Sequence, residues 1–151
     1  MARSLVKIDV HLIFHVKSTS VCLRNEDLPR VFAYIGGIIR TIGGVPIIVG
    51  GMTDHIHILS SLPATLSVAD FVRIIKTNSS KWIKSLDVSY GRFAWQDGYG
   101  AFSVSPSILE QTIDYIKNQQ MHHRKISFTE EYRAFLDAYH LEYDNRYYLS
   151  D

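Results

Sequence analysis

The order of strand-like and helix-like segments is the feature that most constrains this chain. Strand-like segments are short runs of β-branched and aromatic residues, whereas helix-like segments carry apolar residues every three or four positions. Strands are expected at 5–16, 45–52, 54–62 and 100–105, and helices at 28–42, 67–86, 107–123 and 128–140. Because the turn between the second and third strands is short, these two strands are expected to be antiparallel neighbours.

The resulting order, β-α-β-β-α-β, is that of the ferredoxin-like α+β sandwich, followed here by an added helix and a C-terminal helix. This fold hosts many functions, so it does not decide one. Local signals support the helix starts. Asp27 and Ser67 are candidate N-caps, and Asp70 follows Ser67 at the spacing of a capping box. Pro106 suits the first turn of the added helix.

Composition indicates one packed domain, 1–151. The chain has 151 residues, of which 46% are hydrophobic, and this is enough apolar material for a core. No run of about 18 apolar residues occurs, so no membrane span is expected. The start has no small-residue cleavage site, and a single cysteine, Cys22, excludes an internal disulfide and a multi-cysteine zinc site. We therefore expect a cytoplasmic protein.

Positive charge is gathered on one helix, although the net charge of the whole chain is only +1. On a helical projection of 67–86, small hydroxyl residues share one arc with the basic residues Arg73, Lys76, Lys81 and Lys84. Such side chains are used for phosphate contacts, which makes these four residues candidates for nucleic-acid binding. A solvated helix face is the ordinary alternative. Trp82 lies on the apolar arc and is expected in the core.

Two aromatic residues of the loop before the last strand are candidates for base stacking. Trp95 and Tyr99 both lie in this loop, where an aromatic ring can face a nucleic-acid base.

Two histidines alternate within the third strand. Successive side chains of a strand point to opposite faces, so His55 and His57 share one face and Ile56 points to the other. Two neighbouring imidazoles on a rigid strand form half of a metal site. A chance pair on a half-exposed sheet face is the alternative, and the motif alone is weak.

One tyrosine of the helix 107–123 lies away from its apolar stripe. Tyr115, Gln119 and His122 share a face, whereas Ile113 and Ile116 lie more than a quarter turn away. This arrangement argues against core packing for Tyr115. A plain surface tyrosine remains the alternative.

Taken in order, these residues resemble the single-tyrosine HUH transposases of bacteria, which include small insertion-sequence transposases and REP-associated tyrosine transposases. The His-hydrophobic-His motif is His55–Ile56–His57, and the Tyr-x-x-x-Gln of the nucleophile helix is Tyr115 to Gln119. The likeness covers nearly the whole chain, through the segments 77–83, 95–105, 118–132 and 143–149.

The resemblance implies a metal-dependent transposase that cleaves and rejoins single-stranded DNA by transesterification. Tyr115 would be the nucleophile, forming a 5′-phosphotyrosine and a free 3′-hydroxyl. His55, His57 and Gln119 would hold a divalent ion. The amide oxygen and the phosphate substrate favour Mg²⁺ or Mn²⁺, although two imidazoles also tolerate softer ions. Because the phosphotyrosine conserves the energy of the phosphodiester, no nucleotide cofactor is expected.

The resemblance also implies partners. These are single-stranded DNA with a hairpin near the cleavage site, and a second copy in a homodimer. In the family, the tyrosine helix of one subunit commonly completes the histidine site of the other. Whether Tyr115 acts in cis or in trans stays open.

Two further residues are candidates for support. Asp54 could accept a hydrogen bond from a ligand imidazole, although a turn-forming aspartate is an equally good interpretation. His122 could contact the ion or the DNA, although a histidine near a helix C-terminus is also favoured by the helix dipole.

Two other functions stay open from the sequence. A non-catalytic, domesticated module that binds a DNA or RNA hairpin would keep the basic helix and would not need the metal. A metal-dependent hydrolase would use water in place of Tyr115.

Overall fold

A four-stranded antiparallel sheet is the centre of the computed structural model, which describes residues 4–123, 126–142 and 151. The strand order is β2-β3-β1-β4, the order of a ferredoxin-like sandwich, so the fold predicted from the sequence is confirmed. The strands are β1 (Asp9–His15), β2 (Pro46–Gly51), β3 (His55–Ser61) and β4 (Gly100–Val104). The segment 143–149, part of the family resemblance, lies outside the described residues.

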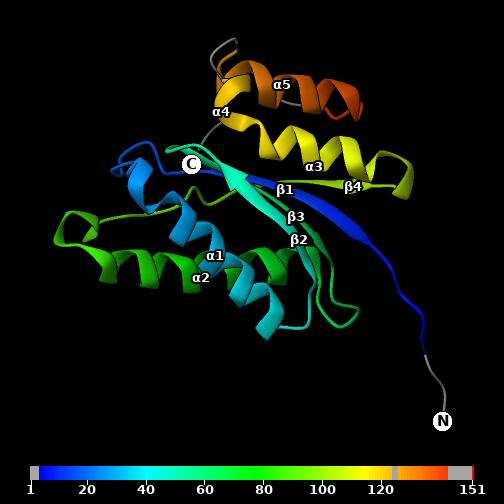
Figure 1. Ribbon diagram of the computed structural model, residues 1–151, viewed down its shortest axis with the longest axis horizontal. Coiled ribbons are helices and arrows are strands. Elements are labelled where there is room, and N and C mark those ends of the chain that lie inside the picture. Colours follow the sequence, from blue (N-terminus) through cyan, green and yellow to red (C-terminus); the bar gives the residue numbers. More distant parts are fainter. Residues whose placement is uncertain (1–3, 124–125, 143–150) are drawn as a thin grey trace.

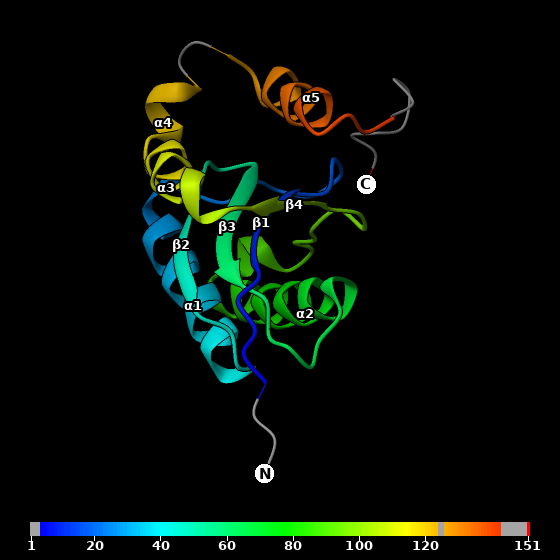
Figure 2. The same cartoon turned by 90° about the vertical axis from the view of Figure 1, so that its right-hand side faces the viewer.

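Helices cover both faces of the sheet (Figures 1 and 2). On one face lie α1 (Leu28–Thr41) and α2 (Val68–Leu86); on the other lie α3 (Leu109–Lys117), α4 (Gln119–His122) and α5 (Phe128–Ala138). Single 3₁₀ turns occur at Asn25–Asp27, Val88–Tyr90 and Pro106–Ile108. The added helix expected at 107–123 is thus two helices that meet at Asn118.

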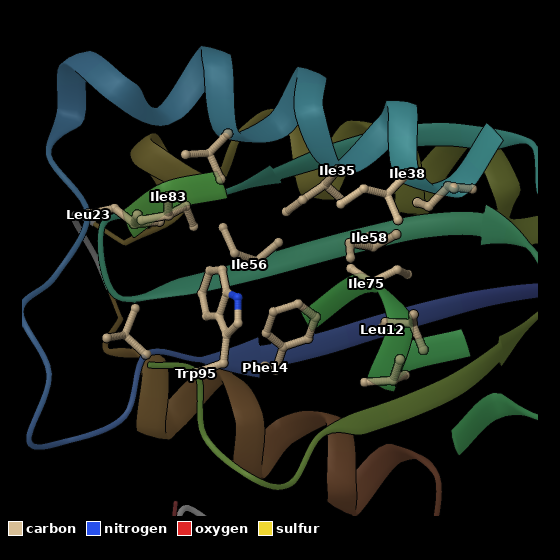
Figure 3. Packing of buried hydrophobic residues seen from close by; sticks show 14 of the residues in the cluster. Leu12, Phe14, Leu23, Ile35, Ile38, Ile56, Ile58, Ile75, Ile83 and Trp95 are labelled. Atoms are coloured by element: carbon tan, nitrogen blue, oxygen red, sulfur yellow. The ribbon is translucent and has the colours of Figure 1, made fainter. Parts of the chain in front are cut away.

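Alternation along the two central strands separates an apolar face from a polar one. Leu12 and Phe14 of β1 and Ile56 and Ile58 of β3 are fully buried in the core beneath α1 and α2 (Figure 3). The residues between them point the other way, toward α3 and α5. The larger core therefore anchors the sheet from one side and leaves the opposite side for the histidines.

Two local expectations need correction, and a third is confirmed. The first strand begins at Asp9, and residues 4–8 precede it without regular structure. Ser67 caps α2 by accepting from the Asp70 amide, but Asp27 does not cap α1. The Asp27 carboxylate instead accepts hydrogen bonds from the Tyr90 hydroxyl at 2.7 Å and from Arg24 at 2.8 Å.

Trp95 is a core residue and not an exposed stacking platform. Its side chain is only 6% exposed, and its ring packs edge-on against Phe14 and Phe93. The indole N–H donates to the Ser79 hydroxyl at 3.0 Å, which satisfies its polar atom. Its place in a loop suggested exposure, but this loop folds back over the α2 face of the sheet.

Two glycines let helices of the polar face approach the sheet closely. A Cβ at Gly50 of β2 would lie 2.8 Å from the Ile116 side chain and 3.0 Å from the Ile116 carbonyl oxygen of α3. A Cβ at Gly100 of β4 would lie 2.8 Å from the hydroxyl of Tyr132 in α5. Side chains at these positions would push the two helices outward, so the glycines set the depth at which α3 and α5 sit.

We predict that Gly50→Ala lowers the free energy of unfolding by roughly 1–3 kcal/mol, because the Ile116 backbone must move to make room. Urea unfolding followed by circular dichroism measures the change. Gly37→Ala in α1 is the control, since no atom lies within 4 Å of a Cβ there. The control should be neutral or up to about 1 kcal/mol more stable, because alanine favours helix. A Gly50 variant as stable as the wild type would contradict this view of α3 packing.

Candidate active site

His55 and His57 lie side by side on the sheet face that α3 and α5 cover. Both side chains are completely buried, and their ring centroids are 5.2 Å apart. The Nδ1 of His55 is 2.8 Å from a carboxylate oxygen of Asp54. The carboxylate is an acceptor, so this nitrogen carries the proton and Nε2 points into the site. This hydrogen bond lowers the pKa of Asp54.

His57 is held from the neighbouring strand by His11. The His11 Nε2 and the His57 Nδ1 are 2.8 Å apart, and β1 pairs with β3 so that Ile13 faces His57. Burial, with the adjacent His57, lowers the pKa of His11 to about 3, and burial also lowers the pKa of His57. Sequence reasoning did not find this role of His11. The alternation that puts His11 on the same face was the available signal.

Tyr115 and Gln119 reach the same place from α3 and α4. The Tyr115 ring stands edge-on to His57, with centroids 5.8 Å apart. The Gln119 side chain is buried, and its Oε1 is 3.1 Å from the His55 Nε2. Its Nε2 donates to the Tyr115 carbonyl and to a carboxylate, which fixes the orientation of the amide. The four residues His55, His57, Tyr115 and Gln119 therefore meet in one chain.

The carboxylate at the centre of this cluster is Glu131 of α5, which is only 1% exposed. Its Oε1 lies 3.1 Å from the His57 Nε2 and 3.5 Å from the His55 Nε2. Its Oε2 accepts hydrogen bonds from the Tyr115 hydroxyl and from the Gln119 amide. Nothing local marks Glu131 in the sequence, because an acidic residue in the first turn of a helix is ordinary.

A further histidine, His123, also reaches the cluster. Its Nε2 lies 3.1 Å from the Gln119 Oε1 and 3.2 Å from the Glu131 Oε1. The side chain of His122, predicted as support, lies outside the described residues.

Burial and charge set the protonation of the tyrosine and of the carboxylate. Burial and the adjacent Glu131 raise the pKa of Tyr115 above its usual range. Burial alone would raise the pKa of Glu131, but its hydrogen bonds with His57 and Tyr115 bring that pKa below its usual range. In this arrangement the tyrosine is neutral and the carboxylate is ionised.

The donor set suits a divalent metal ion. One atom each of His55, His57 and Glu131 lies within 4.8 Å of the other two, and the Gln119 Oε1 is beside them. Imidazole nitrogens with oxygen donors bind several divalent ions, and the carboxylate and amide oxygens favour hard ones.

The predicted basic residues of α2 are on the opposite side of the sheet. Arg73 and Lys84 are exposed and line a hollow of about 360 Å³ that Tyr99 also lines. Lys81 is also exposed, but it does not line this hollow. Lys76 differs, because its ammonium donates to backbone carbonyls of residues 96–98, and burial lowers its pKa to about 8.

Comparison with known proteins decides the family. The sequence model described as "Transposase IS200 like" matches residues 4–119, which contain both histidines of β3, Tyr115 and Gln119. This chain belongs to the IS200-like transposase family. The resemblance found in the sequence is thereby confirmed, and a transposase function follows. Helix α5, with Glu131, lies beyond the matched segment. Curated proteins give no match.

Two solved structures share the fold of this transposase. One is a crystal structure of a protein assigned as a transposase from Deinococcus radiodurans R1, with 24% identity and a TM-score of 0.60 over 79% of this chain and 98% of that chain. The other is a REP-associated tyrosine transposase bound to a REP hairpin, with 15% identity and a TM-score of 0.59 over 82% of this chain and 73% of that chain.

Within the described part of this transposase, none of the helices combines the length and the apolar character that a membrane span requires.

We predict that the transposase loses stability as the pH falls below about 6.5. The folded pKa of His11 is about 3 and its ordinary value is 6.5, so between these values the unfolded chain binds a proton that the folded chain does not. Each such group lowers the free energy of unfolding by about 1.4 kcal/mol for every pH unit by which the pH falls in that window. His11→Gln, which keeps a donor near His57, should make the fall shallower by about this amount.

Urea unfolding at pH 7, 6, 5 and 4 measures this slope, with His140→Asn at an exposed position as the control. Equal slopes for wild type and His11→Gln would show that His11 is not held neutral by burial.

Proposed function

We propose that this transposase cleaves and rejoins single-stranded DNA through a covalent bond to Tyr115. The observation that carries the proposal is the meeting of Tyr115, His55, His57 and Gln119 around one buried carboxylate. A tyrosine that served only packing would not need its hydroxyl beside metal-ligating side chains.

The proposed reaction is a transesterification. The Tyr115 oxygen forms a bond to phosphorus, and the bond from phosphorus to the 3′ oxygen breaks. The tyrosine gives up its proton, and the departing oxygen gains one, so the products are a 5′-phosphotyrosine and a 3′-hydroxyl. A 3′-hydroxyl of another strand can reverse the step, which joins the strands without a nucleotide cofactor.

His55, His57 and Gln119 are proposed to hold a divalent ion, Mg²⁺ or Mn²⁺. When bound, such an ion neutralises charge on the phosphate and stabilises the leaving oxygen. Neighbouring side chains orient the two imidazoles. Asp54 and His11 each bond to the inner nitrogen of one imidazole and leave Nε2 directed at the site. The hydrogen bond from Tyr115 to Glu131 holds the hydroxyl at the same place.

The proposed substrate is single-stranded DNA that carries a hairpin. The fold is shared with a REP-associated tyrosine transposase bound to a REP hairpin, and this supports the class of substrate. Arg73, Lys81 and Lys84 are proposed to contact phosphates, and Tyr99 beside them to stack on a base. Lys76, also predicted to bind nucleic acid, is assigned instead to holding the loop that carries Tyr99.

The test is a denaturing-gel assay for a protein–DNA adduct, with Mn²⁺ or Mg²⁺ and labelled oligonucleotides tiled across the DNA that flanks the gene. We expect a denaturant-stable adduct with the wild type, and none with Tyr115→Phe or with a chelator. Tyr34→Phe is the matched control, because Tyr34 lies on α1 and stacks on Trp82, away from the histidine face.

Each other outcome points to a different nucleophile or a different function. Undiminished adduct in Tyr115→Phe would remove Tyr115 as the nucleophile. Hairpin binding without an adduct would favour the non-catalytic binding module. Metal-dependent cleavage without an adduct would favour the hydrolase.

We further propose that Tyr115 acts in cis, since its hydroxyl reaches the cluster formed by His55 and His57 of the same chain. Mixing Tyr115→Phe with His57→Ala tests this. If the site is completed within one chain, the mixture forms no adduct. Recovery of about a quarter or more of wild-type adduct would instead show that the two chains share sites. The homodimer that the resemblance implies stays a prediction, and light scattering of the wild type addresses it.

A further inference from the structure

Glu131, like His123, belongs to the cluster but lies outside the two family motifs and outside the matched segment, residues 4–119. It comes from α5, which follows the nucleophile helix, and yet its carboxylate touches Tyr115, Gln119 and His57. A buried ionised group needs partners of opposite charge or several hydrogen bonds. The Glu131 carboxylate lies among side chains that could ligate a metal ion, which suggests a specific role for its charge.

Apolar contacts between α5 and the sheet position Glu131 in the site. Tyr132 and Leu136 of α5 are buried against Ile13 of β1 and Phe102 of β4, and Gly100 makes room for the Tyr132 ring. These contacts dock α5 on the sheet. Glu131, adjacent to Tyr132 on this inner side, is thereby directed at His55 and His57.

The pairing of donors and acceptors in the cluster favours a cation. The His55 Nδ1 carries its proton toward Asp54, so in a neutral imidazole Nε2 is a lone pair. That lone pair faces two oxygens, the Gln119 Oε1 at 3.1 Å and the Glu131 Oε1 at 3.5 Å. The Gln119 oxygen is fixed in this direction, because its amide nitrogen donates to Glu131 and to the Tyr115 carbonyl. The His123 Nδ1 faces the Ile126 carbonyl oxygen at 3.0 Å, so in a neutral imidazole its Nε2 is also a lone pair. This Nε2 lies 3.1 Å from the Gln119 Oε1 and 3.2 Å from the Glu131 Oε1, so four acceptor atoms converge.

The spacing of these atoms matches neighbouring ligands of one small ion. Ligands held about 2.1 Å from an octahedral ion lie about 3 Å apart. The Glu131 Oε1 is 3.1 Å from the His57 Nε2 and 3.5 Å from the His55 Nε2. The second carboxylate oxygen remains with the Tyr115 hydroxyl.

From this arrangement we infer that Glu131 is a ligand of the divalent ion, so that metal binding fastens α5 onto the active-site face. The inference rests on the proposed function, which requires the ion. It adds a negatively charged oxygen to the neutral set of two imidazoles and one amide, and this favours a hard ion such as Mg²⁺ or Mn²⁺. It also ties the nucleophile to the metal site through one carboxylate.

The test measures metal binding directly, without DNA. Mn²⁺ is titrated into the full chain, and free Mn²⁺ is followed by electron paramagnetic resonance. Glu131→Gln keeps the size of the side chain and removes the charge, and we expect its Kd for Mn²⁺ to be at least tenfold weaker than that of the wild type. Glu130→Gln is the matched control, because it removes the same charge from the exposed neighbouring position and should change the Kd less than twofold.

A second measurement uses the wild type alone. We expect Mg²⁺ to slow amide hydrogen exchange in α5 (Phe128–Ala138) at least tenfold, and α2 on the other face to change little. Melting without metal confirms that each variant is folded, and the exchange data decide the question if Glu131→Gln is not.

The outcomes separate the two proposals. Equal or tighter Mn²⁺ binding by Glu131→Gln, or no protection of α5 in the wild type that binds the ion, would overturn the role of Glu131 and leave the proposed function intact. If the wild type binds no Mn²⁺, or if His57→Ala binds it as well as the wild type does, the metal site of the proposed function itself is wrong.

Discussion

The alternation of side chains along β1 and β3 is the constraint on which the rest of the structure depends. A strand sends successive residues to opposite faces, so the same short segments bury Leu12, Phe14 and Ile56 on one side and present His55 and His57 on the other. The apolar side packs against α1 and α2 and holds the strands rigid. A polar cluster can then be built on the opposite side, where two imidazoles are fixed by the backbone.

The polar groups of the buried cluster hold one another in place. His11 and Asp54 bind the inner nitrogens of the two imidazoles, and Gln119 and Glu131 occupy the outer ones. Among the described residues, every buried side-chain nitrogen or oxygen has another polar atom within hydrogen-bond distance. Such a network is costly if one partner is lost, so it specifies the positions of the helices that supply its members. The depth of those helices is set by Gly50 and Gly100, which leave space for Ile116 and Tyr132.

Much of the fold could be predicted, because its signals are local. The periodicity of apolar residues located the four strands and the helices, and Ser67 marked the start of α2. Expectations were wrong where a distant partner decided the outcome. The Asp27 carboxylate accepts a hydrogen bond from Tyr90 and does not cap α1, and the Trp95 side chain packs in the core although it lies in a loop. Lys76 also has distant partners, since the backbone carbonyls that accept hydrogen bonds from its ammonium belong to residues 96–98.

The sequence by itself determined that His55 and His57 share a face, and that Tyr115 and Gln119 share a side of one helical segment. It also determined that the order of strands and helices along the chain is compatible with a ferredoxin-like sandwich. These are consequences of periods of two and of about 3.6 residues, which act over a few positions. Only the tertiary structure decided that these groups meet, and that His11 and Glu131 complete the cluster. The meeting depends on strand pairing and on helix packing between segments far apart in the chain, and no local pattern encodes which polar group a docked helix will bury.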